Sequence, residues 1–471
     1  MKLRTVFVCL FRVSQLDPPR VMVLLLMLGV ALFCTSNSAL AQAGKLDTTF
    51  ATGGIFTDSV GQFPGEPSFA NAVAIQGDGK IVVGGSIGFS AAVLRLNGNG
   101  TLDSTFGTGG VVTINLNFPN SPADQVIGVA VQPNGKIVAA LSNVLEDANL
   151  VFLAARLNRD GSLDSTFGTG GIVQTQIGPF GIANSVFALL PDGKILLAGD
   201  GAMARYDAEG QLDSTFGTDG VVAILASQPS AMAVQPDGKI LIGAGAAPPG
   251  IFFPAPGLLN ADFSAAGVIS RYNVDGSLDT SFGIMGQAAT IPVPAAISIQ
   301  REGLFGDSRI LVAGTSNSVN GAISGGSTVG QGAVFGFSLA RYTRDGRIDD
   351  SFGAGGGIFT SFRPAEPLAG AFALLLDREG NIIAAGTAGQ PPAPTSVTQA
   401  DFALARYEPN GALDNTFGTN GEVTTGFGIN EAGIYALALQ TDGKIVAAGI
   451  SQQNPFGGQV GGLVVARYLA Q

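Results

Sequence analysis

The sequence has no histidine and no tryptophan, and its two cysteines, Cys9 and Cys34, both stand near the N-terminus. A chain without histidine cannot form a Ser-His or Cys-His nucleophile system, and it lacks the usual ligands of a zinc site. Charged residues make up only 13% of the chain, whereas 46% of the residues are hydrophobic. Together with 69 glycines and 24 prolines, this composition indicates a turn-rich globular protein and argues against a disordered one.

The N-terminal segment has the pattern of a secretory signal. Arg20 precedes an uncharged apolar run, residues 21–33, which is followed by the small-residue pattern ALAQA ending at position 43. We interpret residues 1–41 as a signal peptide, with cleavage after Ala41 or Ala43. The apolar run is shorter than the roughly 20 residues that a membrane-spanning helix needs. We therefore expect a secreted or periplasmic protein that is not inserted in a membrane.

Removal of the signal would make an acidic chain more acidic. Residues 1–41 carry four basic residues and one acidic residue, so their loss changes the net charge from −11 to −14. Such a chain repels nucleic acids and anionic membrane surfaces, and we expect no nucleic-acid partner. Both cysteines leave with the signal, so the exported domain must hold together without disulfides, which requires a large core. We expect a monomer without a cofactor.

Three short motifs recur seven times each along the rest of the chain. One is Leu-Asp-x-(Thr/Ser)-Phe, another is Arg-(Tyr/Leu), and the third is a turn such as QPDGKILIGA. The turns are centred on Gly79, Gly135, Gly193, Gly238, Gly303, Gly380 and Gly443. The six intervals between Asp47 and Asp414 average about 61 residues, which is too long for one helical hairpin and suits four strands with their turns.

The third copy shows how each repeat is organised. Its apolar runs cover 184–191, 194–200, 202–207 and 220–225, and the first two flank an Asp-Gly turn. Apolar runs of strand length around such turns predict an antiparallel meander. The runs are apolar on both faces, so each four-stranded sheet must be covered on both sides. Radial packing of sheets in a β-propeller provides this cover.

The motifs resemble the delta-60 repeat family of bacterial β-propeller proteins. The signature stands as DGSLDSTFGTGG at residues 160–171 and as QPDGKI at 235–240, and the resemblance covers residues 46–471. It implies an all-β, seven-bladed β-propeller of four-stranded antiparallel blades over residues 44–471, and it implies no activity. Two copies depart from the pattern, with a lengthened turn at 301–309 and with Asn381 where most copies have lysine, so we expect irregular fifth and sixth blades.

The order of the motifs predicts how the ring closes. The first Leu-Asp motif, residues 46–50, has no arginine motif before it, and Arg467 has no Leu-Asp motif after it. Seven complete blades then require residues 53–59 to form the outermost strand of the seventh blade. This arrangement would leave no free sheet edge between the first and last blades.

Each arginine precedes the motif phenylalanine by 11 residues wherever both lie in one uninterrupted copy, as from Arg156 to Phe167. The arginine falls on an interior strand, where an unpaired charge is costly, and each repeat supplies one carboxylate as its partner. We therefore predict seven structural ion pairs. They join Arg95 with Asp103, Arg156 with Asp164, Arg205 with Asp213, Arg271 with Asp279, Arg341 with Asp349, Arg406 with Asp414, and Arg467 with Asp47.

Two stretches of the repeat imitate ligand-binding loops. NRDGSLD places oxygens at Asn158, Asp160 and Asp164, in part like a calcium loop. Other copies have Thr343 or neutral asparagines there, so we interpret the stretch as an Asx turn followed by a capping aspartate and expect no metal. FGTGG could be taken for a phosphate cradle, but no helix follows it, and we interpret its glycines as turn residues with positive φ.

Variation is concentrated in one connection of the repeat. From the end of the second strand to the arginine the chain takes between 6 and 27 residues, whereas the other steps barely change. This loop and the connection between blades emerge on the same face of a propeller, which makes that face the candidate binding face. The candidate contact residues for a protein or glycan are Phe252, Phe253, Phe263, Phe335 and Phe337. The alternative is that these loops fold onto a neighbouring blade.

Two classes of function remain open. The leading one is an exported, non-enzymatic scaffold that binds a partner through its loop-rich face. The other is a carboxylate-based, glycosidase-like hydrolase at the mouth of the central channel. Most aspartates are already assigned to the repeat, which favours the scaffold, and no catalytic residue is assigned. Two converging acids from outside the repeat motifs would favour the hydrolase.

Overall fold

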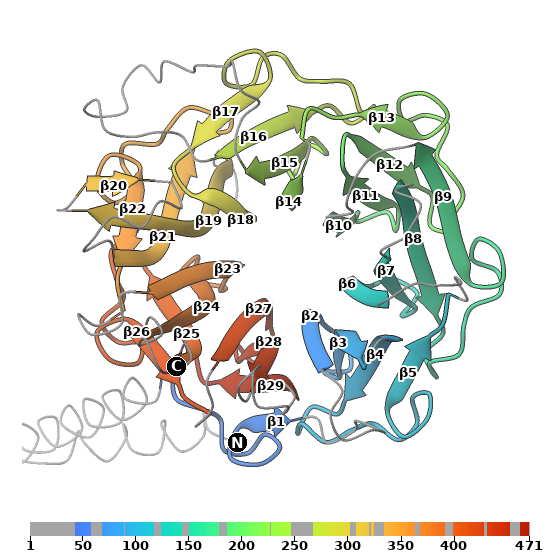
Figure 1. Ribbon diagram of the computed structural model, residues 1–471, viewed down its shortest axis with the longest axis horizontal. Coiled ribbons are helices and arrows are strands. Elements are labelled where there is room, and N and C mark those ends of the chain that lie inside the picture. The colour runs from blue at the N-terminus through green and yellow to red at the C-terminus, as the bar shows by residue number, and fades with distance from the viewer. Residues whose placement is uncertain are drawn as a thin grey trace, which may run out of the picture.

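The predicted all-β, seven-bladed propeller is confirmed. In the computed structural model, seven four-stranded antiparallel sheets stand around one axis (Figure 1). The residues that the structure describes contain no helix long and apolar enough to cross a membrane. These residues are 43–57, 68–88, 90–116, 124–143, 150–178, 186–226, 228–245, 267–301, 308–319, 322–324, 334–362, 368–390, 399–427, 431–452 and 462–470.

Blades 1 to 6 run from the axis to the rim in chain order, and blade 7 takes its outermost strand from the N-terminal segment. Blade 1 contains β2 (Ser68–Ile75), β3 (Ile81–Ile87), β4 (Ser90–Leu96) and β5 (Val111–Ile114). Blade 2 contains β6 (Asp124–Val131), β7 (Ile137–Asn143), β8 (Leu150–Leu157) and β9 (Ile172–Gly178). Blade 3 contains β10 (Val186–Leu189), β11 (Ile195–Gly199), β12 (Ala202–Tyr206) and β13 (Val221–Ala223). Blade 4 contains β14 (Pro229–Val234), β15 (Ile240–Gly245), β16 (Gly267–Tyr272) and β17 (Gln287–Thr290).

Blades 5 to 7 depart in part from the simple four-stranded pattern, through an extra short strand in blade 5 and a bridge between blades 6 and 7. Blade 5 contains β18 (Val293–Arg301), β19 (Ser308–Val319), β21 (Val334–Tyr342) and β22 (Gly357–Thr360), and the short β20 (Ala322–Ser324) also pairs with β19. Blade 6 contains β23 (Leu368–Leu376), β24 (Ile382–Gln390), β25 (Gln399–Tyr407) and β26 (Glu422–Thr425). Blade 7 contains β27 (Glu431–Leu439), β28 (Ile445–Gln452), β29 (Gly462–Tyr468) and β1 (Ile55–Thr57). A single parallel bridge, Ala400 to Glu431, links blades 6 and 7.

The Asp-Gly turns form the hairpins that the sequence predicts. In blade 3 the Gly193 N–H donates to the Leu190 carbonyl oxygen at 2.9 Å, and Asp192 Oδ1 accepts from the Lys194 N–H at 3.2 Å. Gly193 has φ +87°, which a glycine adopts without strain. The turn therefore reverses the chain within four residues and sets the register of β10 against β11.

The ring closes as predicted, through the N-terminal strand. Strand β1 pairs antiparallel with β29, with Ile55 opposite Ala466 and Phe56 opposite Val465 (Figure 1). The expected strand covered 53–59; the observed one is Ile55–Thr57, and residues 58 and 59 lie outside the described part. The first and last segments of the chain thus complete one blade together.

The hydrophobic core lies between the blades. Along β11, Ile195 and Leu197 pack toward blade 2, whereas Leu196 and Ala198 pack toward blade 4, and all are at most 1% exposed. Because the side chains of a strand alternate between two covered faces, the strand is apolar throughout.

Strand direction separates two faces of the disc. The hairpins between first and second strands share one face with the turns that carry the Leu-Asp motif. The second-to-third strand connections and the connections between blades share the other, because consecutive strands are antiparallel. We call this second side the variable face.

Candidate functional site

The structure brings each arginine of the repeat together with the aspartate assigned to it. In six blades the Nε–Oδ2 distance is 2.6–2.9 Å, and in blade 7 Arg467 Nη2 lies 2.9 Å from Asp47 Oδ2. The arginine side chains are at most 7% exposed and the aspartates at most 14%. The pairs are Arg95–Asp103, Arg156–Asp164, Arg205–Asp213, Arg271–Asp279, Arg341–Asp349, Arg406–Asp414 and Arg467–Asp47.

Each arginine also joins its blade to the next. Arg156 donates from Nη1 to the carbonyl oxygen of Ala208 in blade 3, and its guanidinium lies 4.7 Å from the centroid of the Phe167 ring. The corresponding carbonyl contact and ring contact occur in all seven blades, with ring distances of 4.4–4.7 Å. The arginine is therefore an inter-blade clamp, and the motif phenylalanine is the surface on which it lies.

A second cation completes most of these clusters, and the sequence analysis missed it. Lys136 Nζ lies 2.6 Å from Asp164 Oδ2, and the turn lysines of four other blades make the same contact. Arg309 replaces the lysine in blade 5, at 3.0 Å from Asp349. In blade 6 Asn381 donates instead to Asp377 Oδ2 at 2.8 Å. The sequence feature that could have indicated this second cation is the lysine that directly follows the turn glycine in most copies.

These contacts keep the repeat aspartates ionised. Burial raises the pKa of Asp47, but hydrogen bonds from Thr49 and Lys444 and the charge of Arg467 outweigh it and lower the pKa from 3.8 to about 2. In the other six blades the same opposition of burial to hydrogen bonds and cations leaves the aspartate pKa below 3.8. A carboxylate held in this way cannot supply a proton near neutral pH, so it is unsuited to general acid catalysis.

The two stretches that imitate ligand loops form turns. Asp160 Oδ1 accepts from the Ser162 N–H at 3.0 Å, and Asp164 Oδ1 accepts from Thr166 Oγ1 at 2.8 Å. The carboxylates thus receive hydrogen bonds two residues ahead, as in Asx turns. The glycines of FGTGG have φ values of +52°, +63° and +97°, as turn glycines do.

Only part of the predicted aromatic contact surface lies in the described residues. Within that part, the prediction is wrong for Phe337, which is buried. Phe252, Phe253 and Phe263 lie outside the described residues. Phe335 is half-buried at the start of β21. Phe337 is fully buried, with its ring edge-on to Phe362 at 4.6 Å between centroids. Phe337 is a core residue because β21 begins at Val334 and carries it between blades 5 and 6.

The innermost strands of six blades, all except blade 3, each present one bulged residue near the axis, and we call this set the axial ring. Register shifts in the first hairpin place Asn71, Ile127, Ser230, Ala295, Phe372 and Tyr435 there. Several of these residues contact the neighbouring blade. Asn71 Nδ2 donates to the Val126 carbonyl oxygen at 3.1 Å, and the rings of Phe372 and Tyr435 lie 5.7 Å apart between centroids.

Tyr435 stands out within the axial ring. Its side chain is 42% exposed, and no other aromatic side chain of the described residues is exposed to this degree. An exposed ring supported by a second aromatic offers a flat surface and a hydroxyl group to a ligand. Sequence reasoning missed Tyr435; the available signal was its position eight residues before the turn glycine, where Phe372 also stands.

Asp200 differs from the repeat aspartates. It lies in the short connection between β11 and β12, on the variable face. Burial raises its pKa, and its Oδ1 atom is buried with no hydrogen-bond partner among the described residues. It is therefore an acid outside the repeat motifs with the direction of pKa shift that a proton donor needs.

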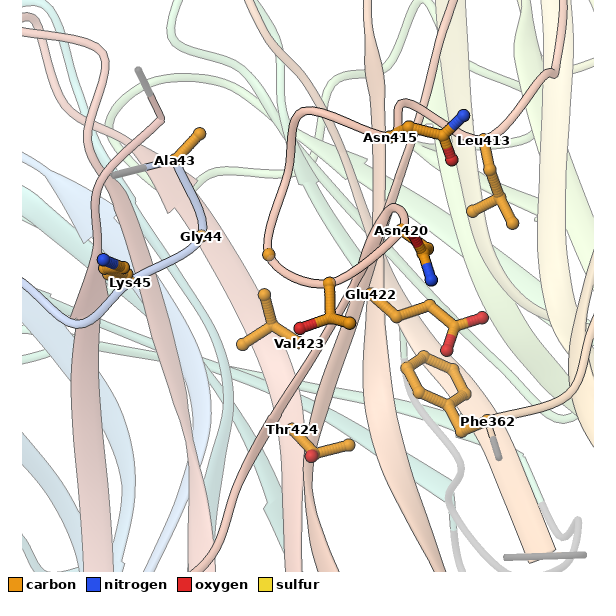
Figure 2. Close-up of a pocket in the computed structure, with 12 residues that line it drawn as sticks. Ala43, Gly44, Lys45, Phe362, Leu413, Asn415, Asn420, Glu422, Val423 and Thr424 are labelled. Atoms are coloured by element: carbon orange, nitrogen blue, oxygen red, sulfur yellow. The ribbon is translucent and has the colours of Figure 1, made fainter. Parts of the chain in front are cut away.

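A groove of about 730 Å³ opens on the outer rim, beside blade 6. Figure 2 shows Phe362, Leu413, Asn415, Asn420 and Glu422 on one side, and the N-terminal Ala43–Lys45 on the other. Gly418, Thr419, Val423 and Thr424 complete the lining. Glu422 begins the outer strand, where blades 1 to 3 have Val111, Ile172 and Val221. We call this site the rim groove.

Part of the chain matches a described family. Residues 76–106, 132–167, 190–216, 262–282 and 380–417 match the family "Domain of unknown function (DUF5122) beta-propeller". Each segment contains the arginine and the Leu-Asp-x-(Thr/Ser)-Phe motif of one blade. The match supports a repeat-based propeller, and the finer resemblance to delta-60 repeats remains a prediction.

Several solved structures are similar to this chain at low sequence identity. Virginiamycin B lyase from Staphylococcus aureus is 12% identical, over 88% of this chain and 99% of that one, with a TM-score of 0.45. The GH93 alpha-L-arabinofuranosidase of Fusarium graminearum is 9% identical, over 87% and 97%, with a TM-score of 0.40. Aldose sugar dehydrogenase from Streptomyces coelicolor is 10% identical, over 88% and 98%, with a TM-score of 0.39. No curated protein matches the sequence.

Proposed function

We propose that the protein is an exported, non-enzymatic scaffold that binds a glycan, with a protein surface as the other possible partner. The observation that supports binding is Tyr435, an exposed aromatic ring among innermost strands whose other large aromatics are buried or half-buried. Exposed aromatic surface in a folded domain is a mark of recognition sites.

The surroundings of Tyr435 favour a sugar. A tyrosine ring presents an apolar face for the C–H face of a pyranose and a hydroxyl group for its polar edge. Phe372, 5.7 Å away, supports the ring from the neighbouring blade, and Asn71 supplies an amide at the equivalent position of blade 1. Aromatic surface with a few fixed polar groups is the usual composition of a small-molecule site.

The alternative, a glycosidase-like hydrolase, depends on Asp200. Its raised pKa suits a general acid, but the reaction needs a second carboxylate about 5 to 10 Å away. The seven aspartates of the repeat are engaged with arginine, and six of them with a second cation as well. The scaffold is therefore the better-supported function.

The test is a glycan array probed with the purified protein and two variants. Y435A should weaken glycan binding by about tenfold or more, since losing an aromatic anchor costs more than about 1.4 kcal/mol. The matched control is M285A, which truncates a 78% exposed side chain on a rim turn of blade 4 and should bind like the wild type.

Two outcomes would contradict the proposal. Equal binding by wild type and Y435A would remove Tyr435 from the site. Release of reducing sugar from an oligosaccharide by the wild type, abolished in D200N, would establish the hydrolase instead.

A further inference from the structure

The seventh blade is built from a repeat that is cut within a turn. In blade 2 the turn before the Leu-Asp motif is closed by the Asn158 N–H, which donates to Ser162 O at 2.8 Å, and by the Gly161 N–H, which donates to Asn158 O at 3.0 Å. In blade 7 the Leu469 N–H donates to Lys45 O at 2.9 Å, and the Gly44 N–H donates to Leu469 O at 2.7 Å. The two chain ends therefore reproduce the turn without a peptide bond between them. We call residues 43–50 and 467–470 the seam.

Ala43 occupies a fixed position in the seam. In blade 2 the corresponding residue is Asp160, whose carbonyl oxygen accepts the Gly107 N–H of the preceding blade at 2.7 Å. The Ala43 carbonyl oxygen accepts the Gly418 N–H at 2.9 Å in the same way. Ala43 is 3% exposed and belongs to the hydrophobic cluster between blades 6 and 7.

The spacing of the seam confirms this alignment. Counted from Arg467 through Ala470 and on from Ala43, Phe50 is the eleventh residue, as in every uninterrupted copy. Ala470 then takes the position of Arg159. The Ala470 carbonyl oxygen accepts a hydrogen bond from Arg406 Nη1. In the same way, the Arg159 carbonyl oxygen accepts a hydrogen bond from Arg95 Nη1. Ala43 is thus the first residue that blade 7 needs.

We propose that the signal is cleaved after Ala41 and not after Ala43. A leader peptidase would hydrolyse the Ala41–Gln42 bond, with the hydroxyl of water going to the Ala41 carboxyl group and its proton to the Gln42 amine. Both bonds have the required small-residue pattern, so the sequence alone leaves the choice open. The proposal rests on the export part of the proposed function and is independent of ligand binding.

Cleavage after Ala43 would leave the seam incomplete. The Gly418 N–H would lose the backbone hydrogen bond that joins blade 6 to the seam, and the 3% exposed Ala43 would be missing from the packing between blades 6 and 7. The new N-terminus would fall on Gly44. This residue has φ +81°, and the Gly418 backbone leaves no room for a Cβ there, so a shift of the chain that placed Lys45 at this position would not be tolerated. The rim groove would also lose Ala43 from its wall.

The first test is to express the full precursor in a bacterium with an export pathway and to sequence the mature N-terminal peptide by mass spectrometry. The expected peptide begins at Gln42, either as free glutamine or as the lactam formed when the α-amino group displaces ammonia from the side-chain amide. A peptide beginning at Gly44, or a precursor that keeps its signal, would overturn the proposal. Glycan binding does not enter this readout, so failure here is distinct from failure of the proposed function.

The second test compares chains released from a removable fusion partner with Gln42, Ala43 or Gly44 as the first residue. Chains beginning at Gln42 and Ala43 should share one melting temperature, and the chain beginning at Gly44 should melt lower. Three equal melting temperatures would show that Ala43 is dispensable and would remove the structural reason for the choice.

Discussion

Arg467 and Asp47, 420 residues apart in the sequence, form an ion pair with Nη2 and Oδ2 separated by 2.9 Å. The pair has the same surroundings as those formed within one copy: Arg467 lies 4.6 Å from the Phe50 ring and donates to the carbonyl oxygen of Gly98 in blade 1. The cycle of inter-blade contacts is therefore complete, with the last arginine fastened to the first blade.

Deletion of residues 44–60 should open this cycle. The deletion removes β1, Asp47 and Phe50, so the edge of β29 becomes exposed and Arg467 is left buried without its carboxylate. We expect the melting temperature to fall by at least about 5 °C in differential scanning calorimetry. The control is a chain that lacks only residues 1–41. It retains β1 and should melt at the same temperature as the full-length chain. An unchanged transition after the longer deletion would mean that closure contributes no stability.

Substitution within one cluster should separate the roles of its two cations. D213N leaves Arg205, 5% exposed, without its carboxylate, whereas R205M leaves Asp213 still paired with Lys194 at 2.9 Å. We expect D213N to cost about 3 to 5 kcal/mol in urea unfolding and R205M less, with the double variant losing less than the sum. D192N, which alters a 56% exposed carboxylate, should be nearly neutral. Additive losses would show that the two buried side chains do not interact in solution.

How far the sequence predicts these clusters depends on spacing. Arg205 and Asp213 lie in the stretch of fixed length, so their partnership could be inferred from the 11-residue step. The lysines could not be paired in that way, because the variable loop lies between lysine and aspartate: Lys136 and Asp164 are 28 residues apart, but Lys239 and Asp279 are 40 apart. The lysines recur after the turn glycines, but because their spacing to the aspartates varies, the sequence does not show which residue they contact.

The aromatic residues show the same limit. Phe337 follows a glycine-rich stretch, and nothing in that composition marks Val334 as the start of a strand that carries Phe337 into the core. Tyr435 stands in an apolar run and would be taken for a core residue by its neighbours. The β-bulge between Ile434 and Ala436 leaves Tyr435 42% exposed beside Phe372, and the composition of the run does not show a bulge; only the fixed distance to the turn glycine marks the position.

Blade 6 offers a site for a gain in stability. Asp414 has Arg406 as its cation but no lysine, because position 381 is asparagine, and it is more exposed than the other repeat aspartates, at 14%. N381K should restore the second cation and stabilise the protein by up to about 1 kcal/mol, since a half-exposed ion pair contributes little more. The reverse change in blade 1, K80N, should destabilise by a similar amount. Loss of stability in N381K would show that the hydrogen bond from Asn381 to Asp377 matters more than the missing cation.

The lowered aspartate pKa values predict an acid limit to stability. A carboxylate whose pKa is lower in the folded state adds stability that is fully present above its ordinary pKa of 3.8 and is lost as the pH falls through the folded value, about 2 for Asp47. The melting temperature should therefore drop steeply below about pH 4. Asp200 has the opposite sign, so D200N should raise the melting temperature at pH 7 and lose this advantage as the pH falls. A wild-type melting temperature that stays constant down to pH 2 would contradict the assignment of ionised, paired aspartates.

The seam implies that the chain can be opened at any equivalent turn. A circular permutant would join Ala470 directly to Ala43 and begin at Asp160, between Arg159 and Asp160 of blade 2, so that the hydrogen bonds of that turn take over the role of the seam. Because surface turns tolerate new termini and the joined seam restores the 11-residue step, we expect a folded protein with the same circular dichroism spectrum and a melting temperature at or above that of the parent. A second permutant opened between Ala154 and Ala155, in the middle of buried β8, is the control and should not fold. If the Asp160 permutant also fails to fold, the seam is not equivalent to an intact turn, and the alignment of Ala43 with Asp160 is wrong.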